Sequence, residues 1–383
     1  MENPMHTIAW QVVSHSANVN LICVGCQLRS IRDFRMQEPE NDFIDKVEAR
    51  PSTNEPPPPT RRRWFRPIAA GILFLIILFY MIDLVHWLVV QNNLANWEAT
   101  ISRDEAGIRA DCASYSIGPE HSNTAVLLVH GINASPQAFY KLAPRLSKSQ
   151  WFCRCLRLPG FGEPVPAYAK ATIENWVESL DNEIMDLKKR HQHVFIVAHS
   201  LGAAVTIRCM IEKQNSQFVD GLILAAPAIQ VSSRRSPILP TEFWHTTLGA
   251  MLVFTHNLQS PFGEDALDPN ERTSPFRTPF TPLRVANRTF NLIRQNKGNA
   301  HQLDLPVLMC LAQQDSVIDN LAAEEFFHQL PHSDNRIIVF KNSAHAILVD
   351  YQWEDLATSI TTFIESRLPP LQPLQRPSLE RHE

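Results

Sequence analysis

The stretch of sequence that decides the predicted fold is Val194-Phe195-Ile196-Val197-Ala198-His199-Ser200-Leu201-Gly202-Ala203-Ala204. Its first part is an apolar, β-branched run that indicates a buried strand, and residues 201–213 have a helical pattern. A strand that passes directly into a helix forces a tight turn at Ser200, and the small residues Ala198 and Gly202 leave room for it. Such a turn would lift the Ser200 hydroxyl clear of the backbone, where a reactant can approach it.

Short β-rich runs alternate with helical patterns from about residue 112 onward. Strands are predicted at residues 125–129, 151–158, 194–198, 219–225, 306–311 and 336–340. Helices are predicted at residues 173–190, 201–213, 321–330 and 351–366, with a further helix capped by Ser135. Apolar strands that alternate with helices are typical of a parallel sheet covered by helices on both faces. The predicted class is therefore α/β, over residues 112–368, with no clear first pair of strands before residue 120.

One insertion interrupts this alternation. Residues 228–304 are rich in proline, and they contain a strongly apolar helical stretch over 243–254. A second helical face follows at Leu283, Ala286, Phe290 and Ile293. We interpret the insertion as a helical cap over the carboxyl edge of the sheet, because its aromatic content argues against a long disordered loop.

A long apolar segment precedes the α/β pattern. Residues 68–82 contain no charged residue, and the apolar run continues past Asp83 and His86 to Val90. As a helix, residues 65–90 would reach roughly 35–40 Å, which exceeds the ~30 Å hydrocarbon core of a bilayer. A buried core helix is the alternative, but a core helix of this length normally has a polar face. We therefore expect residues 65–90 to form a transmembrane helix.

The charges beside this segment predict its orientation. Arg61, Arg62, Arg63 and Arg66 precede the apolar run, whereas the residues after it carry charges of both signs. By the positive-inside rule, the N-terminus is expected in the cytoplasm and the α/β domain on the periplasmic or other extracytoplasmic side. A cleaved signal peptide is not expected, unless translation starts downstream at a residue such as Met36.

The ends of the chain are predicted to lie outside the folded domain. Residues 1–60 are expected to be a disordered tail that ends in a stiff proline-rich linker, and residues 369–383 a second tail. Cys23 and Cys26 form an isolated C-x-x-C pair in the first tail. No second pair or histidine at ligand spacing accompanies them, so no metal site is expected.

Three cysteines of the α/β domain leave two states open. A disulfide from Cys112 to Cys153 or Cys155 is compatible with an oxidising compartment, but buried thiols are favoured.

The chain of 383 residues has a formal net charge of −4. A nucleic-acid-binding protein usually has a concentrated basic surface, so no nucleic-acid partner is expected.

Several motifs and their order resemble those of α/β-hydrolases, in particular the lid-bearing esterases and monoacylglycerol lipases. The resemblance covers residues 124–367, roughly two thirds of the chain. Its motifs are Leu127-Leu128-Val129-His130-Gly131, Leu158-Pro159-Gly160-Phe161-Gly162, the turn at Ser200, Leu311-Ala312-Gln313-Gln314-Asp315 and Asn342-Ser343-Ala344-His345. Ala198 replaces the first glycine of the family's G-x-S-x-G pattern, and alanine is also small. The resemblance implies the α/β-hydrolase fold and a serine hydrolase that needs no metal or other cofactor.

The resemblance also implies a chain order of nucleophile, acid and histidine. Ser200 is then the nucleophile. Asp315 follows the predicted strand 306–311 at the same sheet edge and is the expected acid, with Asp319 as the alternative. His345 follows the last predicted strand and is the expected general base.

An oxyanion hole is implied at two backbone amides, those of Ile132 and Leu201. Two stretches, beginning at Asn133 and Asn287, match the acceptor pattern for N-glycosylation. A glycan at Asn133 would crowd the oxyanion loop, which favours a periplasmic location over a eukaryotic lumenal one.

These features together predict a membrane-anchored serine hydrolase that cleaves a carboxylic ester, with a lipid-like acyl ester favoured as the small-molecule partner. Thioesterases, acyltransferases and peptidases use the same triad and remain alternatives. A non-catalytic binding protein is a different class, disfavoured because all three triad positions are filled. The cap residues selected as candidates for substrate contact are Phe243, Trp244, Leu248 and Met251. These side chains are expected to line an acyl pocket, and docking on the bilayer is the alternative.

Overall fold

The computed structural model describes residues 62–234, 236, 241–260 and 263–369. The predicted tail over residues 1–60, with Cys23 and Cys26, lies outside the described residues, as does nearly all of the tail at 369–383. Residues from Arg61 onward form one compact unit.

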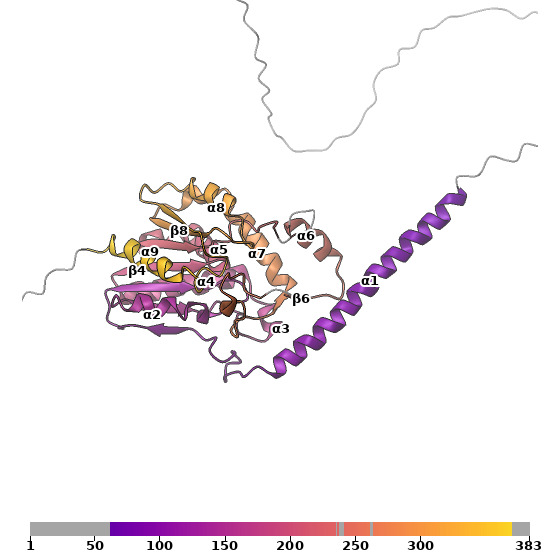
Figure 1. Ribbon diagram of the computed structural model, residues 1–383, viewed down its shortest axis with the longest axis horizontal. Helices are drawn as coiled ribbons and strands as arrows, with labels where there is room; N and C mark the ends of the chain where they lie inside the picture. The colour runs from indigo at the N-terminus through magenta and orange to yellow at the C-terminus, as the bar shows by residue number, and fades with distance from the viewer. Residues whose placement is uncertain (1–61, 235, 237–240, 261–262, 370–383) are drawn as a thin grey trace, which may run out of the picture. The chain divides into compact units, whose positions relative to one another are not determined.

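A single large sheet forms the centre of the α/β domain (Figure 1). Its strand order is β1-β3-β2-β4-β5-β8-β9, in which β1 runs antiparallel to β3 and the other neighbours are parallel. The strands are β1 (Tyr115–Ile117), β2 (Thr124–Val129), β3 (Phe152–Leu156), β4 (His193–His199), β5 (Gly221–Ala225), β8 (Val307–Ala312) and β9 (Arg336–Phe340). Because the parallel strands point the same way, the loops after β2, β4, β8 and β9 meet at one edge of the sheet.

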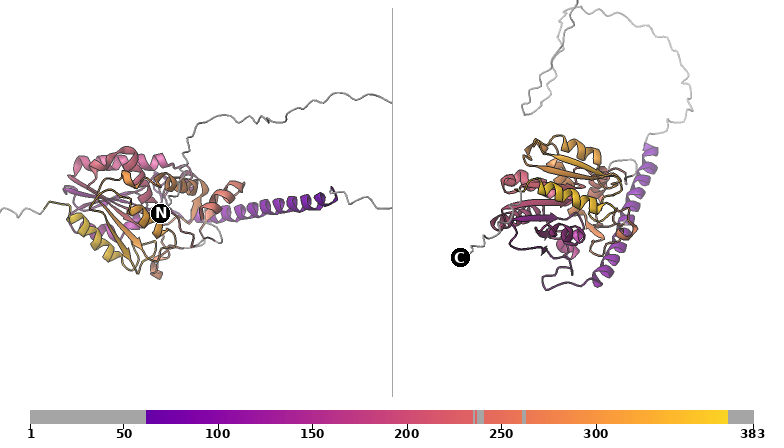
Figure 2. Two further views of the ribbon diagram at one scale, coloured as in Figure 1. Left: turned by 90° about the horizontal axis from the view of Figure 1, so that it is seen from above. Right: turned by 60° about the vertical axis from the view of Figure 1, so that its left-hand side comes forward.

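Helices cover both faces of this sheet (Figure 2). Along β2, Leu127 faces one hydrophobic cluster while Val126 and Leu128 face the other, as the period-two geometry of a strand requires. One face packs against α4 (Ile173–Arg190), α5 (Leu201–Lys213) and α8 (Asn320–Phe327). The opposite face packs against α2 (Leu142–Ser147) and α9 (Trp353–Glu365). The predicted mostly parallel sheet with helices on both faces is confirmed.

Two short elements complete the α/β domain. Ser135 caps a 3₁₀ helix, η1 (Pro136–Phe139), by accepting a hydrogen bond from the Gln137 amide. The helix predicted to start here is therefore present, although it has the tighter 3₁₀ form. A four-residue helix, α3 (Val165–Tyr168), follows β3.

The insertion over residues 228–304 contains both predicted helices and a small sheet that the sequence did not predict. The helices are α6 (Thr241–Met251) and α7 (Leu283–Asn296), so the first one ends earlier than the expected residue 254. Between them, β6 (Asn257–Gln259) pairs antiparallel with β7 (Phe280–Pro282). Three-residue strands are too short to produce a readable alternation of polar and apolar residues, which explains why they were missed.

The long N-terminal helix, α1, extends from Arg62 to Ala99. The span expected over residues 65–90 lies within this helix, which continues for nine residues beyond Val90. Its first half carries exposed apolar side chains, including Phe65, Leu75 and Ile82. Val90 and Leu94 in its second half are buried.

Cys112, Cys153 and Cys155 are free, buried thiols. Burial raises the pKa of the Cys155 thiol to about 12, so this side chain remains protonated at neutral pH. The structure thus contains the thiol form that the sequence favoured, and not the disulfide.

A buried carboxylate ties the cap to the loop after β9. The Asp350 side chain is fully buried, and it accepts backbone hydrogen bonds from Leu267 at 3.0 Å, Asp268 at 2.9 Å and Ala344 at 2.7 Å. A buried charge is tolerated only where such partners replace its lost water. Asp350 therefore holds two distant segments, one from the cap and one from the edge of the sheet, against each other.

Asp350→Ala is expected to lower the free energy of unfolding by about 3 kcal/mol or more, because it leaves several buried amides without an acceptor. Chemical denaturation of the purified protein measures this loss. Asp186→Ala is the matched control. Asp186 makes an exposed ion pair with Arg190 on the same helix, and its removal is expected to cost less than about 1 kcal/mol. Equal effects of the two substitutions would contradict the role given to Asp350.

Candidate active site

Ser200 occupies the turn between β4 and α5. Its backbone has φ 51° and ψ −117°, a left-handed conformation that costs energy in a residue with a side chain. Gly202 makes this turn possible, because a Cβ atom there would lie 2.4 Å from the carbonyl oxygen of Val129. The predicted need for a small residue at this position therefore has a direct steric cause. The turn is tied to the neighbouring strand β5, because the amide of Ser200 donates to the carbonyl of Ala225 at 3.1 Å.

Three of the predicted residues meet at the carboxyl edge of the sheet. His345 Nε2 lies 2.9 Å from Ser200 Oγ, and His345 Nδ1 lies 2.8 Å from Asp315 Oδ2. Ser200 follows β4, Asp315 follows β8 and His345 follows β9, so the three come from segments far apart in the chain. All three side chains are buried.

The electrostatics of this group follow from burial and charge. Burial alone would raise the pKa of the Asp315 carboxyl, but the charge of His345 and the hydrogen bonds that the carboxylate accepts hold the pKa below its usual value. Burial would lower the pKa of His345, but the Asp315 carboxylate and its hydrogen bond raise the pKa above 6.5. Asp315 is therefore ionised and accepts the Nδ1 proton, which leaves the Nε2 lone pair directed at Ser200.

The second oxygen of Asp315 fixes its orientation. Oδ1 accepts hydrogen bonds from the amides of Val317 and Ile318, both at 2.8 Å. Asp319, the alternative acid in the sequence, instead accepts hydrogen bonds from amides in the first turn of α8, with the Leu321 amide at 3.0 Å. Asp315 is thus the carboxylate that the structure brings to His345.

Asp265, a cap residue that the sequence analysis did not single out, supports the same group. Its Oδ2 atom accepts a hydrogen bond from the Ser316 amide at 2.9 Å and a longer one from the His345 amide at 3.4 Å. The carbonyl of Asp265 accepts the amide of Ala346 at 2.9 Å. The cap therefore braces the loops that carry both the acid and the histidine. Asp265 lies in a segment without periodicity, so no pattern could have indicated it.

The two amides predicted for an oxyanion hole lie beside Ser200. Leu201 is the first residue of α5, so its amide has no partner within the helix. Ile132 lines the same cavity as Ser200, and a Cβ atom on the neighbouring Gly131 would lie only 3.0 Å from Ser200 Cβ. The loop after β2 therefore approaches Ser200 closely.

Two buried histidines near this loop are held neutral. Burial lowers the pKa of His130 to about 4 and that of His199 to about 3. Neutral His199 carries one ring proton, and its Nε2 atom lies 2.9 Å from the carbonyl oxygen of His345, where it donates. His130 Nε2 accepts the amide of Leu158 at 3.2 Å. Each ring therefore links two segments of the chain, His130 to the start of the loop after β3 and His199 to the loop after β9.

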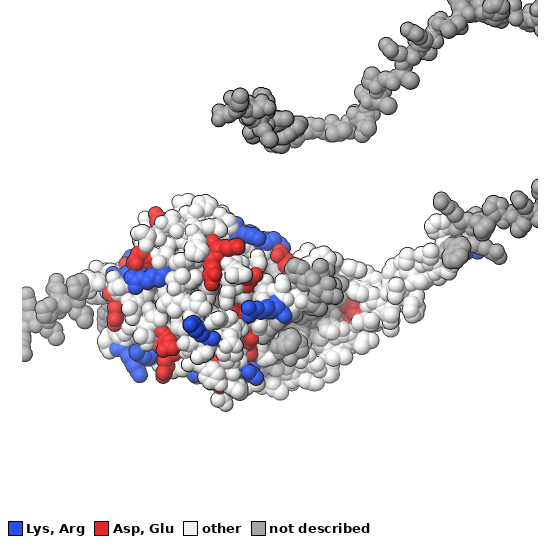
Figure 3. Space-filling model, turned by 45° about the horizontal axis from the view of Figure 1, so that its top comes forward, with Lys and Arg blue, Asp and Glu red and all other residues white. Residues whose placement is uncertain are grey.

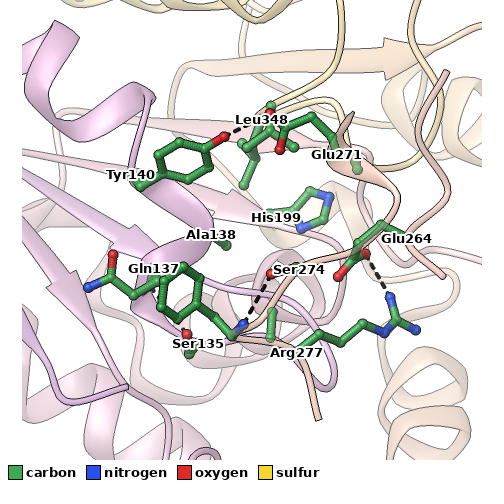
Figure 4. A pocket seen from close by; sticks show the side chains of 14 residues that line it. Ser135, Gln137, Ala138, Tyr140, His199, Glu264, Glu271, Ser274, Arg277 and Leu348 are labelled. Atoms are coloured by element: carbon green, nitrogen blue, oxygen red, sulfur yellow. Dashed lines mark hydrogen bonds and ion pairs between the residues drawn. The ribbon is translucent and has the colours of Figure 1, made fainter. Parts of the chain in front are cut away.

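Two adjoining cavities open beside Ser200. One contains Ser200, His345 and the oxyanion loop. The other extends from His199 towards Tyr140 and Leu348 (Figure 4). Glu264 and Arg277 line both cavities and form an ion pair of 2.6 Å between them. The wall that the two cavities share is therefore charged, while much of the cavity beside Tyr140 is apolar.

None of the cap residues selected from the sequence has a described side chain that lines this site. Phe243 and Met251 on α6 are 46% and 48% exposed, and the two cavities are lined by other residues. The side chains of Trp244 and Leu248 lie outside the described residues. Instead of α6, the cap segment between β6 and β7 lines the site, with Glu264, Asp265 and Arg277. Among the described residues, no cluster of histidine, cysteine and acidic side chains suited to a metal ion is found.

Comparisons with known proteins agree with this architecture. A thermostable monoacylglycerol lipase of Bacillus sp. (strain H-257) is 22% identical over 232 residues, which cover 61% of this chain and 86% of that protein. A carboxylesterase of Bacillus subtilis (strain 168) is 18% identical over 63% of this chain and 92% of its own length.

Solved structures share the fold. The monoacylglycerol lipase of Paleococcus ferrophilus superposes with a TM-score of 0.56 at 20% identity, covering 67% of this chain and 98% of that one. A soluble variant of monoglyceride lipase from Saccharomyces cerevisiae has a TM-score of 0.59 at 16% identity, with 67% and 91% covered. The family model for serine aminopeptidase S33 matches residues 120–352. The chain therefore belongs to the serine aminopeptidase S33 family of α/β-hydrolases.

Proposed function

We propose that this protein is a serine hydrolase that cleaves carboxylic esters through an acyl-enzyme intermediate. The observation that carries the proposal is the hydrogen-bonded chain from Asp315 through His345 to Ser200, with distances of 2.8 and 2.9 Å. Relatives that are a monoacylglycerol lipase and a carboxylesterase support the ester as the substrate bond.

The proposed mechanism uses each group in the state that its surroundings favour. Ser200 Oγ attacks the ester carbonyl while His345 Nε2 takes the hydroxyl proton, and Asp315 stabilises the imidazolium that forms. The amides of Ile132 and Leu201 bind the oxyanion of the tetrahedral intermediate. His345 then gives the proton to the departing alkoxide, which leaves an acyl group on Ser200. A water molecule, deprotonated by His345, attacks the acyl carbonyl and releases the acid.

The substrate that we propose is a lipid-like acyl ester. On the face shown in Figure 3, α1 is almost uncharged, whereas the α/β domain carries charges of both signs. The helix is long and apolar enough over Phe65–Ala99 to cross a membrane. We propose that it anchors the protein, with the N-terminus in the cytoplasm and the hydrolase domain on the periplasmic or other extracytoplasmic side. An enzyme held at a bilayer meets lipid esters at high local concentration.

A panel of p-nitrophenyl or glycerol esters of increasing chain length tests the activity, with Ser200→Ala as the blank. The wild-type protein is expected to hydrolyse them, and the variant to lose roughly three or more orders of magnitude in kcat. Parallel assays with acyl thioesters and aminoacyl amides separate the thioesterase and peptidase alternatives. Retention of the wild-type rate in Ser200→Ala would overturn the proposed nucleophile.

The pH dependence of kcat/KM tests the roles of His345 and Asp315. Because His345 must be neutral to accept the proton, activity is expected to fall as the pH drops through a pKa that lies above 6.5. Asp315→Asn removes the charge that raises this pKa, so burial prevails and the acid limb moves to lower pH. The same change is expected to lower kcat by a factor of about 10³ to 10⁴.

Asp319→Asn is the matched control for this profile, because Asp319 caps α8 and is not bonded to His345. Its acid limb is expected to coincide with that of the wild-type protein. An acid limb that shifts in Asp319→Asn but not in Asp315→Asn would show that Asp319, and not Asp315, is the acid.

Membrane anchoring predicts that the full chain sediments with membranes, resists extraction by alkaline carbonate and dissolves in detergent, because its apolar half is held by the hydrocarbon core. Deletion of residues 1–82 is expected to release the hydrolase domain. Intact mass of the membrane-bound protein distinguishes an anchor from a signal peptide. Release of the full chain by carbonate, or a mass that lacks the apolar segment, would contradict the anchor.

A further inference from the structure

The second half of α1 is built into the hydrolase domain. Asp83, Val90 and Leu94 are only 3%, 4% and 8% exposed, and their spacing places them on one side of the helix. Val90 and Leu94 form a hydrophobic cluster with Val165 and Phe280 of the domain. The family match begins at residue 120, so these contacts belong to a segment that precedes the part of the chain shared with the family.

Asp83 makes the most specific of these contacts. Its carboxylate accepts backbone hydrogen bonds from Val253 at 2.8 Å, Phe254 at 2.9 Å and Thr255 at 3.1 Å, directly after α6. One turn along α1, His86 Nδ1 lies 3.0 Å from the hydroxyl of Thr255. Three converging amides satisfy a charge that would otherwise be costly to bury. Asp83 therefore fixes the end of the cap helix to α1.

The clamped segment leads directly into the small cap sheet. The carbonyl of His256 accepts the amide of Leu283 at 2.9 Å, and β6 then pairs with β7 over three residues. On the α1 side, the Trp97 ring lies 5.7 Å from the ring of Phe280 in β7. The helix therefore contacts β7 directly through Phe280, and Asp83 binds the segment that leads into β6.

The cap sheet in turn holds the oxyanion loop. Asn133 follows Ile132, and its side-chain amide donates to the hydroxyl of Thr281 in β7 at 2.6 Å. The carbonyl of Asn133 accepts the amide of Thr278 at 2.8 Å. Asn133 has φ 58°, a left-handed conformation that these partners stabilise and that sets the direction of the preceding peptide. In the sequence this residue only matched a glycosylation pattern, whereas its side chain is buried and bonded.

We propose that Asp83 is a positioning residue for the oxyanion loop and acts through β6, β7 and Asn133. The inference rests on the proposed function, since an oxyanion loop matters only if Ser200 attacks a carbonyl. In this proposal α1 anchors the protein and also holds the cap sheet in place, and the cap sheet aligns the Ile132 amide. A displacement of about 1 Å at such a site can lower the rate by roughly a hundredfold.

The same clamp fixes the depth of the domain at the bilayer. The 18 residues from Phe65 to Ile82 span about 27 Å as a helix, close to the hydrocarbon thickness of a membrane. Asp83 then lies where the apolar half of α1 ends. The cap segment that it binds would then lie near the membrane boundary.

The test compares Asp83→Ala, Asp83→Asn and the control Asn96→Ala in the full chain in detergent. Asn96 is exposed on the same helix. Asp83→Ala is expected to lower kcat by roughly tenfold with a smaller change in KM, because the loop acts on the transition state. Asp83→Asn keeps the size and one acceptor oxygen, so its loss is expected to be intermediate, and it replaces Asp83→Ala if that variant does not fold. Asn96→Ala is expected to retain the wild-type kcat.

A double-mutant cycle with Thr281→Val separates positioning from general destabilisation. If Asp83 acts through β7 and Asn133, the double variant Asp83→Ala/Thr281→Val is expected to lose little more kcat than the worse single variant. Multiplicative losses, or a folded Asp83→Ala with the wild-type kcat, would overturn the proposal.

Hydrogen exchange of the peptide that covers residues 131–135 provides a reading that does not depend on activity. The exchange is expected to be faster in Asp83→Ala than in the wild-type protein and unchanged in Asn96→Ala. A wild-type protein without esterase activity would overturn the proposed function, while this exchange would still decide the coupling. Unchanged exchange in folded Asp83→Ala would overturn the coupling itself.

Discussion

The close approach of α5 to the strand β2 is the constraint on which the site depends. Gly202 allows the first turn of the helix to lie against the carbonyls of Val129 and His130, where any Cβ atom would collide. This contact forces Ser200 into its left-handed conformation and points its side chain away from the sheet. The buried β4 strand on one side and α5 on the other keep the strained turn in place. The position of the hydroxyl therefore follows from packing in the core of the domain.

Buried or half-buried carboxylates that accept backbone amides recur as the means of joining distant segments. Asp315 holds its own turn and the histidine, Asp265 and Asp350 join the cap to the loop after β9, and Asp83 joins the cap to α1. Each carboxylate loses water on burial and regains hydrogen bonds only when its segments are correctly placed. Such contacts specify one arrangement of loops that have little hydrophobic packing of their own.

The sequence predicted the elements whose pattern is local and strong. The helices at residues 173–190 and 201–213 and the strand at 336–340 have the predicted bounds, because long apolar periodicity leaves little ambiguity. The edge strand β1 and the cap sheet were missed, since three residues carry too little pattern. The far end of α1 was placed near Val90 because a change from apolar to polar composition was taken as the end of the helix. The helix continues across that change because Val90 and Leu94 are buried against the domain, a long-range contact that the sequence does not reveal.

The residues of the candidate site also differ in how far the sequence could predict them. Ser200, Asp315 and His345 were selected because each follows a readable strand and matches a family motif, and the structure brings them together. Asp265 and Asn133 make hydrogen bonds between segments far apart in the chain, which no spacing in one sequence reveals. The cap residues Phe243 and Met251 were chosen for their apolar character, but the direction in which a cap helix presents its side chains depends on packing that the sequence does not specify.

The central claim is that Ser200 is an activated nucleophile, and covalent trapping tests it most directly. The full chain in detergent would be treated with a fluorophosphonate, digested, and the adduct located by peptide mass spectrometry. The proposed mechanism predicts one phosphonyl group on Ser200, lost in Ser200→Ala and greatly slowed in the variant in which Asn replaces Asp315. A folded wild-type protein that remains unlabelled, or an adduct on another residue, would contradict it.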